Sequence, residues 1–365
     1  MEEQLDPEQF HVTPALFREW RSPRFGNENP QKLKSKVWEW LVHSKLSGYA
    51  ATQRMNGPSA IDAGPTWSFD RFGQSVTELS DGRTIYIGGE HEDHYDPDFY
   101  IYNDVVVKHP DGAVDFYCYK KSDFPPTDFH TATLVDETIV IIGSLGYLGE
   151  RNQQETQLYL LHLDNFEIRK VESSGSSPGW IHRHIATLGE DKRSIILTKG
   201  KVDIGREHNL RENIDDWKLN LHDWSWERLT SRNWPRFEIS RKDKKYNHLW
   251  DLRQALWSLE VNWVDHHKEE MERLEKSLGY RPEVKLVKEL YRFDMEPQDL
   301  QKDEDNYNIF WIYINGVRIR FTEERHCLQV VVEGILSGDK VSLIKEQLLD
   351  RLAALENSAC ELEEY

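Results

Sequence analysis

Residues 74–89 read QSVTELSDGRTIYIGG, and this stretch is one copy of a pattern that occurs three times in the 365-residue chain. Each copy begins with an anchor residue that is Gln or His, and the anchors are Gln74, His130 and His184. Successive anchors therefore lie 56 and 54 residues apart. A period of this length predicts blades of β-sheet that follow one another along the chain.

The residues after each anchor also repeat in order. A polar turn led by Asp comes first, and a β-branched run that predicts a strand follows it. The turns begin at Asp81, Asp136 and Asp191, and the runs are residues 84–87, 138–141 and 194–197. Each run ends at glycine (Gly88-Gly89, Gly143 and Gly200), and third strands start at Asn103, Thr156 and Asp215. One supersecondary unit accounts for all three copies.

This order of elements resembles the kelch repeat family of β-propellers over residues 66–230. The resemblance is carried by residues 71–75, by Gly88-Gly89, and by the segment from Asp216 to Trp226. It implies a four-stranded blade in each repeat, with glycines at tight turns and an aromatic residue between blades. The second repeat has Ile168 where that aromatic residue is expected. We therefore expect a mainly β fold with a kelch-like partial propeller of three blades; an all-β sandwich with regularly spaced strands is the alternative.

The sequence divides into four predicted parts. Residues 1–65 form an N-terminal segment with an amphipathic helix within residues 30–55, and residues 66–235 contain the blades. Residues 246–357 form a C-terminal α+β domain, and residues 358–365 form an acidic tail that we expect to be disordered. Because three blades are too few to close a ring, we expect the helix, the C-terminal domain or a second copy of the chain to cover the open sides.

The C-terminal domain has its own pattern of predicted elements. We expect a long helix over residues 249–278, strands over 284–293, 309–314, 317–321 and 327–332, and a helix over 341–355. The dipeptide Asn315-Gly316 predicts a tight hairpin between two of these strands. In the N-terminal helix, Trp38 and Trp40 face different sides, so one is expected in the core and the other in the core or against a partner.

The charge of the chain limits its partners. The formal net charge is −18, which disfavours binding to a nucleic-acid backbone and favours a basic protein partner. Three cysteines without paired or metal-ligand spacing are typical of a reducing compartment. No secretory signal or membrane span is present in the sequence, and we expect a cytoplasmic protein that does not bind a membrane.

The densest polar cluster is residues 90–98, predicted as a loop at a blade end, where propellers bind their ligands. Predicted partner-binding residues there are His91, Asp93, His94, Tyr95 and Asp96, and further candidates by register are Tyr147, Arg151, Trp180 and His182. His91, His94 and Asp96 are also a weak candidate for a metal site. His182 is predicted to be a surface contact.

The histidine anchors are predicted to be structural, with hydrogen bonds to backbone groups between strands. Gln74 occupies the position of His130 and His184, and Gln can replace a hydrogen-bonding His but not a general base. The chain has no nucleophile elbow, no activated Cys, and no phosphate loop, because the glycine-rich stretch 143–149 lacks the Lys of such loops. We therefore expect no catalytic residue and no cofactor.

These observations predict a non-enzymatic protein-binding module or scaffold that uses the blade-end loops. One alternative is an acidic inhibitor or immunity-type protein that neutralises a basic toxin or nuclease. Another is an enzyme that acts on a sugar or nucleotide at the propeller mouth. A homodimer, in which two three-blade arcs complete one another, is a further alternative for the assembly.

Overall fold

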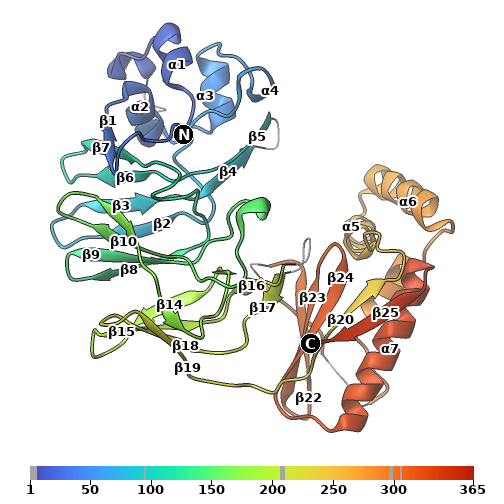
Figure 1. Ribbon diagram of the computed structural model, residues 1–365. Helices are drawn as coiled ribbons and strands as arrows, with labels where there is room; N and C mark the ends of the chain where they lie inside the picture. Colours follow the sequence, from blue (N-terminus) through green and yellow to red (C-terminus); the bar gives the residue numbers. More distant parts are fainter. Residues whose placement is uncertain (1–5, 94–95, 206–209, 296–298, 305) are drawn as a thin grey trace. The chain divides into compact units, whose positions relative to one another are not determined.

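The computed structural model describes residues 6–93, 96–205, 210–295, 299–304 and 306–365 (Figure 1). The chain divides into two compact parts, Met1–Arg232 and Asn233–Tyr365, which we call unit 1 and unit 2. The fold is mainly β, with several antiparallel sheets and fewer helices. The described ranges contain no helix that combines the length and apolar character needed to cross a membrane.

Unit 1 contains six helical segments and the first nineteen strands of the chain among its described residues. The helical segments are η1 (Pro7–Phe10), α1 (Pro14–Trp20), α2 (Lys36–Ser44), α3 (Gly48–Arg54), α4 (Ala60–Ala63) and η2 (Leu148–Glu150). The strands are β1 (Gln31–Leu33), β2 (Ser75–Glu78), β3 (Thr84–Ile87), β4 (Glu90–Asp93), β5 (Asp96–Ile101), β6 (Val105–Lys108), β7 (Val114–Cys118), β8 (Thr131–Val135), β9 (Thr138–Ile142), β10 (Leu158–His162), β11 (Ile168–Lys170), β12 (Ser174–Gly175), β13 (Ile181–His182), β14 (Ile185–Leu188), β15 (Ser194–Thr198), β16 (Lys201–Asp203), β17 (Leu210–Glu212), β18 (Trp217–Asn220) and β19 (Ser225–Arg228).

Three sheets of unit 1 share one plan, in which four antiparallel strands follow one another in chain order (Figure 1). The orders are β2-β3-β6-β7, β8-β9-β10-β11 and β14-β15-β18-β19, with β1 added beside β7 and β12 beside β19. The first strands of successive sheets touch, because β8 contacts both β2 and β14. Among the described residues, the sheets close into neither a barrel nor a propeller.

The middle sheet is buried on both faces, and the alternation of side chains along β9 shows how. Ile139 and Ile141 pack with residues of β3 and β6 in the first sheet. Val140 and Ile142 point the other way and pack with residues of β15 and β18 in the third sheet. Since successive side chains of a strand face opposite sides, an unbroken apolar run is what a doubly covered strand requires.

The N-terminal segment covers the first sheet, but it is not one long helix. The predicted helix over residues 30–55 is instead β1, α2 and α3, because capping residues interrupt it. The Ser35 hydroxyl accepts a hydrogen bond from the Trp38 N–H (3.2 Å) at the start of α2, and Lys45 ends that helix with a φ of 52°. Trp38 and Trp40 are both fully buried, so of the two alternatives left open for them the core is confirmed and the contact with a partner is not.

Unit 2 contains a six-stranded sheet with helices packed against it. Its helical segments are α5 (Leu249–Glu260), α6 (Val264–Leu278), η3 (Val284–Glu289) and α7 (Gly338–Glu356). Its strands are β20 (Arg236–Arg241), β21 (Gln301–Lys302), β22 (Ile309–Ile314), β23 (Val317–Glu323), β24 (Cys327–Glu333) and β25 (Cys360–Glu364), in the order β21-β22-β23-β24-β20-β25. The hairpin at Asn315-Gly316 is confirmed, since both residues have positive φ (51° and 75°), as a type I′ turn requires.

Three predictions for this part of the chain are wrong. The long helix over residues 249–278 is two helices, α5 and α6, which a turn at Asn262 (φ 56°) separates. The segment 284–293 contains no strand, because residues 284–289 form the 3-10 helix η3 and residues 290–293 are a turn and irregular structure. The acidic tail is not disordered, because β25 pairs with β20 and places Cys360 opposite Arg241. The tail is ordered because its backbone pairs with β20, and the composition of the tail does not indicate this pairing.

Candidate functional site

The three sheets of unit 1 are joined by a backbone ladder at the residue before each anchor. Gly73, Phe129 and Arg183 all have a left-handed backbone, with φ of 63°, 48° and 54°. The Phe129 N–H donates to the Gly73 carbonyl, and the Arg183 N–H donates to the Phe129 carbonyl, both at 2.8 Å. Non-glycine residues adopt this conformation at a cost and usually where the surrounding structure requires it. The hydrogen bonds of the ladder therefore hold these three residues in a constrained backbone conformation.

The histidine anchors form a second set of links between sheets. Nε2 of His130 lies 2.8 Å from the Ser75 hydroxyl, and Nε2 of His184 lies 2.9 Å from the Thr131 hydroxyl. Each partner is the residue that follows the anchor of the preceding sheet. The prediction that these histidines are hydrogen-bonded is confirmed, but their partners are side-chain hydroxyls, whereas backbone groups were expected. Gln74 is the anchor that does bond backbone, through the Gly88 carbonyl at 3.4 Å.

Next to the ladder lies a group of four residues that we call the carboxyl–arginine cluster: Glu90, Asp128, Phe129 and Arg183. Glu90 begins β4 directly after the Gly88-Gly89 turn, and the other three residues precede the anchors of the second and third sheets. The Arg183 guanidinium lies over the Phe129 ring, 3.6 Å from its centroid. The repeat thus brings two carboxyl groups, an aromatic ring and a guanidinium group close together.

The two carboxyl groups of this cluster disturb one another. Burial and then the charge of Asp128 raise the pKa of Glu90 to about 7, and the charge of Arg183 opposes the rise. Burial raises the pKa of Asp128 as well, although the Gly146 N–H and the Ser144 hydroxyl donate to its Oδ1 at 2.6 and 3.2 Å. Oδ2 of Asp128 is buried and has no hydrogen-bond partner in the described part of the chain, so it can accept a hydrogen bond from a donor that enters the cluster.

Burial also lowers the pKa of the Arg183 guanidinium, against the attraction of Glu90 and Asp128. Its guanidinium packs on the Phe129 ring, while the residue as a whole still reaches solvent. Neither carboxylate forms an ion pair with it in the described part of the chain. The cluster therefore holds three ionisable groups whose charges are only partly matched.

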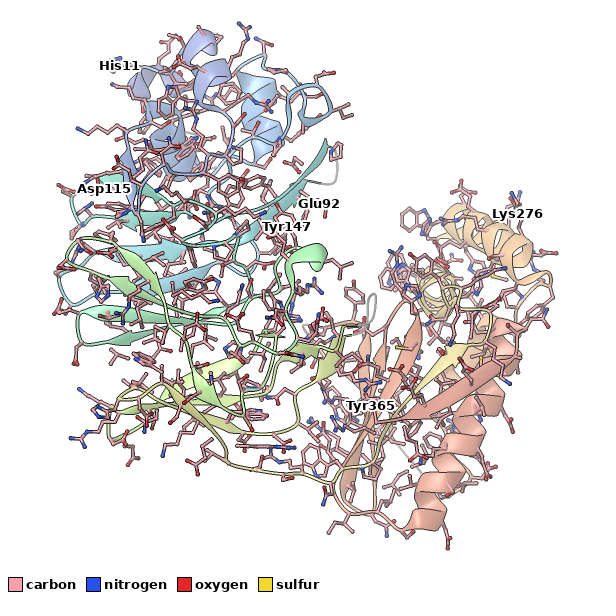
Figure 2. All side chains as sticks on the ribbon, in the orientation of Figure 1. His11, Glu92, Asp115, Tyr147, Lys276 and Tyr365 are labelled. Carbon is pink, nitrogen blue, oxygen red and sulfur yellow. The ribbon has the colours of Figure 1, made fainter. Side chains whose placement is uncertain are left out.

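Three of the predicted partner-binding residues meet around the loop of residues 143–151. Trp180 Nε1 donates to the Leu145 carbonyl (3.0 Å), and Arg151 donates to the Gly146 carbonyl (3.2 Å). The Tyr147 hydroxyl accepts a hydrogen bond from the Ile101 N–H of β5 (2.9 Å), which places this loop beside the β4–β5 ribbon (Figure 2). Because Asp128 also bonds Gly146, the loop borders the carboxyl–arginine cluster.

Arg151 and Trp180 are engaged within the fold. Arg151 forms an ion pair with Asp203 of β16 at 2.9 Å, and Trp180 is only 4% exposed. A buried indole has little surface for a partner, so Trp180 supports the conformation of the loop through its hydrogen bond to Leu145. The binding role of these residues remains a prediction.

The predicted loop at residues 90–98 is a two-stranded ribbon, β4 paired with β5. His91 is 8% exposed, and its Nδ1 lies 3.3 Å from the Asp70 carbonyl while Nε2 lies 3.6 Å from Asp98 Oδ2. Asp93 and Asp96 are described only as backbone of these strands, and His94 and Tyr95 lie outside the described residues. The described residues contain no group of three His, Cys, Asp or Glu side chains placed to hold a metal.

His182 differs from its predicted surface position, because it is 1% exposed. Both of its ring nitrogens are buried without a hydrogen-bond partner in the described structure. Burial, followed by the charge of Arg183, lowers its pKa well below the usual value. It is therefore a neutral core histidine, and strand β13, which pairs with β16, explains why it points inward.

Sequence reasoning missed Glu90, Asp128 and Arg183 as a group. The signal was present in the register, since Phe129 and Arg183 stand one residue before their anchors, as Gly73 does. Aligning the residues upstream of the anchors would have brought Arg183 and Asp128 to the same end of adjacent sheets. Nothing in the sequence shows that the charge of Asp128 raises the pKa of Glu90.

The chemistry open to this cluster is the binding of a cation or the transfer of a proton. A pair of desolvated carboxyl groups favours any positive group that approaches it, because the cation removes their mutual repulsion. A carboxyl group with a pKa near 7 can also give or take a proton at neutral pH. Arg183 adds a donor that suits a carboxylate or phosphate.

Comparisons with known proteins identify no family for this chain. No family model matches it, and no curated protein matches it. One solved structure that does match is titled "Structure of YjhT", with 12% sequence identity and a TM-score of 0.32. The match covers 45% of this chain and 52% of that chain, so it spans about half the length of the solved structure.

Proposed function

We propose that unit 1 is a kelch-like partial β-propeller and that it works as a non-enzymatic protein-binding module, with the carboxyl–arginine cluster as its recognition point. Three four-stranded antiparallel sheets in succession, with their first strands in contact, support the fold proposal. Blade ends are where propellers bind their ligands, and the cluster lies at the turn that ends the second strand of the first sheet. The partner is a protein that presents a basic side chain.

The observation that carries this proposal is the carboxyl pair. Burial and the charge of Asp128 raise the pKa of Glu90 to about 7, and Oδ2 of Asp128 is buried without a hydrogen-bond donor among the described residues. A Lys or Arg side chain that reached this pair would displace the proton of Glu90 and bond both carboxylates. Binding would lower the pKa of Glu90 and release a proton at neutral pH. The net charge of −18 favours the approach of such a partner.

Exposed apolar side chains near the first strands add contact area for a protein partner. Phe72 is 66% exposed, Val76 of β2 is 56% exposed, and Ile185 of β14 is 46% exposed. These residues lie on or next to the first strands, which form edges of their sheets. Apolar surface beside a charged anchor is a usual composition for a protein interface.

The proposal predicts the outcome of a peptide-display selection against the full-length protein. We expect the selected peptides to share a Lys or Arg, and we expect Glu90→Gln and Asp128→Asn each to weaken their binding by more than roughly tenfold. Titration calorimetry in two buffers of different ionisation enthalpy should show that wild-type binding releases protons and that Glu90→Gln binding does not.

Glu92→Gln is the matched control, since it removes the same charge from the same strand at an exposed position. It should leave affinity nearly unchanged. Peptides without a basic residue, or equal affinity in Glu90→Gln, would contradict the proposal. If Glu92→Gln weakened binding as much as Glu90→Gln, and salt removed it, diffuse charge attraction by an acidic inhibitor would explain the result better.

A second candidate function is an enzyme acting on a sugar or nucleotide, and the same carboxyl group favours it. A Glu with a pKa near 7 beside an arginine meets the requirement for general acid–base catalysis. Turnover of a sugar or nucleotide by the purified protein, lost in Glu90→Gln and kept in Glu92→Gln, would support the enzyme and remove the non-enzymatic proposal.

A further inference from the structure

Unit 2 contains a groove that has no part in the function proposed for unit 1. It lies between helix α5 and the sheet, where β21, β22 and β23 contribute residues, and it has a volume of about 870 Å³. A cavity of this size is large enough for an extended ligand of several residues. The groove is lined by residues of unit 2 only.

Exposed aromatic rings form the most prominent part of the groove lining. Tyr246, Trp250, Trp257 and Tyr307 all line it and are 51%, 50%, 46% and 62% exposed. The Trp250 and Tyr307 rings lie against each other, with centroids 4.8 Å apart. Large rings are costly to leave in water, and four in one groove indicate a surface that binds something.

The floor of the groove is rigid and its charges are already matched. Arg253 of α5 donates to Glu323 of β23 at 2.7 Å, and the Tyr291 hydroxyl donates to the same carboxylate at 2.6 Å. The Arg253 guanidinium also lies 4.4 Å from the centroid of the Phe310 ring. This network fixes α5 on the sheet and offers no unmatched charge to a ligand.

The remaining charges of the lining balance. Glu260 is paired with Lys288, and the charged residues left are Asp251, Glu324, Lys302 and Arg325, two of each sign. A lining without net charge suits an uncharged ligand better than a nucleotide, an acidic peptide or a basic peptide. The rings then supply most of the binding energy.

The spacing of the tryptophans identifies the shape of that ligand. Trp250 and Trp257 are seven residues apart on one helix, which separates them by about 10.5 Å along its axis. Three residues of a polyproline II helix span about 9.3 Å. Consecutive turns of such a helix can therefore lie against the two indole rings, with Gln254 of the same lining between them.

The polar groups of these rings suit the same ligand. In the described structure the indole N–H groups of Trp250 and Trp257 donate no hydrogen bond. The hydroxyl groups of Tyr246 and Tyr307 form no hydrogen bond there either. A polyproline II segment has no internal hydrogen bonds, so all its carbonyls are free to accept. We propose that this groove binds a proline-rich segment of a partner protein in the polyproline II conformation.

A fluorine NMR titration of the full-length protein tests the proposal. The protein is labelled with 5-fluorotryptophan, and the Trp250 and Trp257 signals are assigned with Trp250→Phe and Trp257→Phe. An acetylated, amidated ten-residue polyproline peptide should shift both signals, and a Gly-Ser peptide of equal length should shift neither. Trp250→Ala and Trp257→Ala should each weaken binding by roughly tenfold or more.

Tyr313→Ala is the control, since Tyr313 is 52% exposed but does not line the groove, and it should bind the peptide as wild type does. Glu90→Gln should also bind normally, which separates this result from the function of unit 1. Circular dichroism spectra of all variants should match that of the wild type. The proposal is overturned if the polyproline peptide shifts neither signal, or if cellotetraose shifts both and the peptide does not, which would make the groove a saccharide site.

Discussion

The anchors His130 and His184 combine two properties that seldom occur together, since they are almost fully buried and they bond only a single hydroxyl each. Burial lowers the pKa of both histidines to about 3. They are therefore neutral in the folded protein at neutral pH. A hydrogen bond to Ser75 or Thr131 needs only the neutral ring, which explains why Gln74 can occupy the same position.

These histidines predict a loss of stability in mild acid. In the unfolded chain they bind protons near pH 6.5, whereas in the folded chain they do so only near pH 3. Protons therefore favour the unfolded state as the pH falls from 6.5 towards 3, by up to about 1.4 kcal/mol per pH unit for each histidine. We expect the free energy of unfolding of His130→Gln/His184→Gln, measured in urea, to fall less steeply over this range.

Exposed His222→Gln is the control and should keep the wild-type slope. Glu90 acts in the opposite direction, since its pKa is raised from 4.5 to about 7 and its protonation stabilises the fold as the pH falls through this window. It is present in every variant, so comparison of slopes cancels its effect. Identical slopes in the wild type and the double variant would show that the histidines are not buried as neutral rings.

At the scale of elements, the glycine that ends the second strand of each sheet sets how close the next sheet can come. A Cβ on Gly88 would lie 2.1 Å from the Thr127 carbonyl oxygen, and one on Gly143 would lie 2.2 Å from the Ile181 carbonyl oxygen. The same two carbonyls accept hydrogen bonds from the Gly89 and Ser144 N–H groups at 2.8 and 3.0 Å. The glycine is therefore needed for a contact between sheets as well as for a turn.

Gly88→Ala and Gly143→Ala should each destabilise unit 1 by about 2–4 kcal/mol, because the methyl group overlaps a carbonyl and the backbone φ is positive. Thermal or urea unfolding monitored by circular dichroism measures the effect. Gly149→Ala is the matched control, since no atom lies within 4 Å of its Cβ position and its φ is not positive; it should be neutral or slightly stabilising. Equal stability of all three variants would show that the sheets can separate at no cost.

The elements that sequence predicted well are those fixed by local pattern. The strands after each anchor and the Asn315-Gly316 hairpin depend on β-branched residues and on turn chemistry, and both are visible within a few residues. The C-terminal strand β25 could not be predicted, because its glutamates become a strand only through pairing with β20, more than a hundred residues away. Likewise, the break at Asn262 carries no Pro or Gly to mark it.

The candidate site was harder to predict than the fold. The sequence predicted a binding site in the acidic run at 90–98. The residue of that run that belongs to the proposed site is Glu90, the first of the run. The pKa of Glu90 is raised by burial and by the charge of Asp128, which is distant in sequence. Burial raises the pKa of Asp128 as well. Trp180 and His182 were predicted to bind from their register in the repeat, yet both are almost fully buried.

At the scale of the whole molecule, the chain has separate cores in its two units. Unit 2 is built around one cluster that includes Ile312, whereas unit 1 has three, one for the N-terminal helices and two between sheets. Ile312 and Ile141 are both fully buried. Cores of this kind can lose stability independently when few residues are shared between them.

Independent cores predict that a cavity in one unit leaves the other intact. Ile312→Ala should destabilise unit 2 by about 2–5 kcal/mol, and Ile141→Ala should do the same to unit 1. Hydrogen exchange followed by mass spectrometry should show faster exchange in peptides of the altered unit only. Faster exchange throughout the chain in both variants would mean that the two units unfold as one.

Strand β25 has a consequence for how the protein avoids aggregation. It is the last strand in the order of the unit 2 sheet, and it carries Glu361, Glu363 and Glu364. An open sheet edge invites another chain to add a strand, and charged side chains along that edge discourage it. Glu361 and Glu364 are paired with Lys244 and Lys345, so the edge carries charged groups of both signs. Removal of β25 would expose the backbone of β20 as a new sheet edge to which a neighbouring molecule could add a strand.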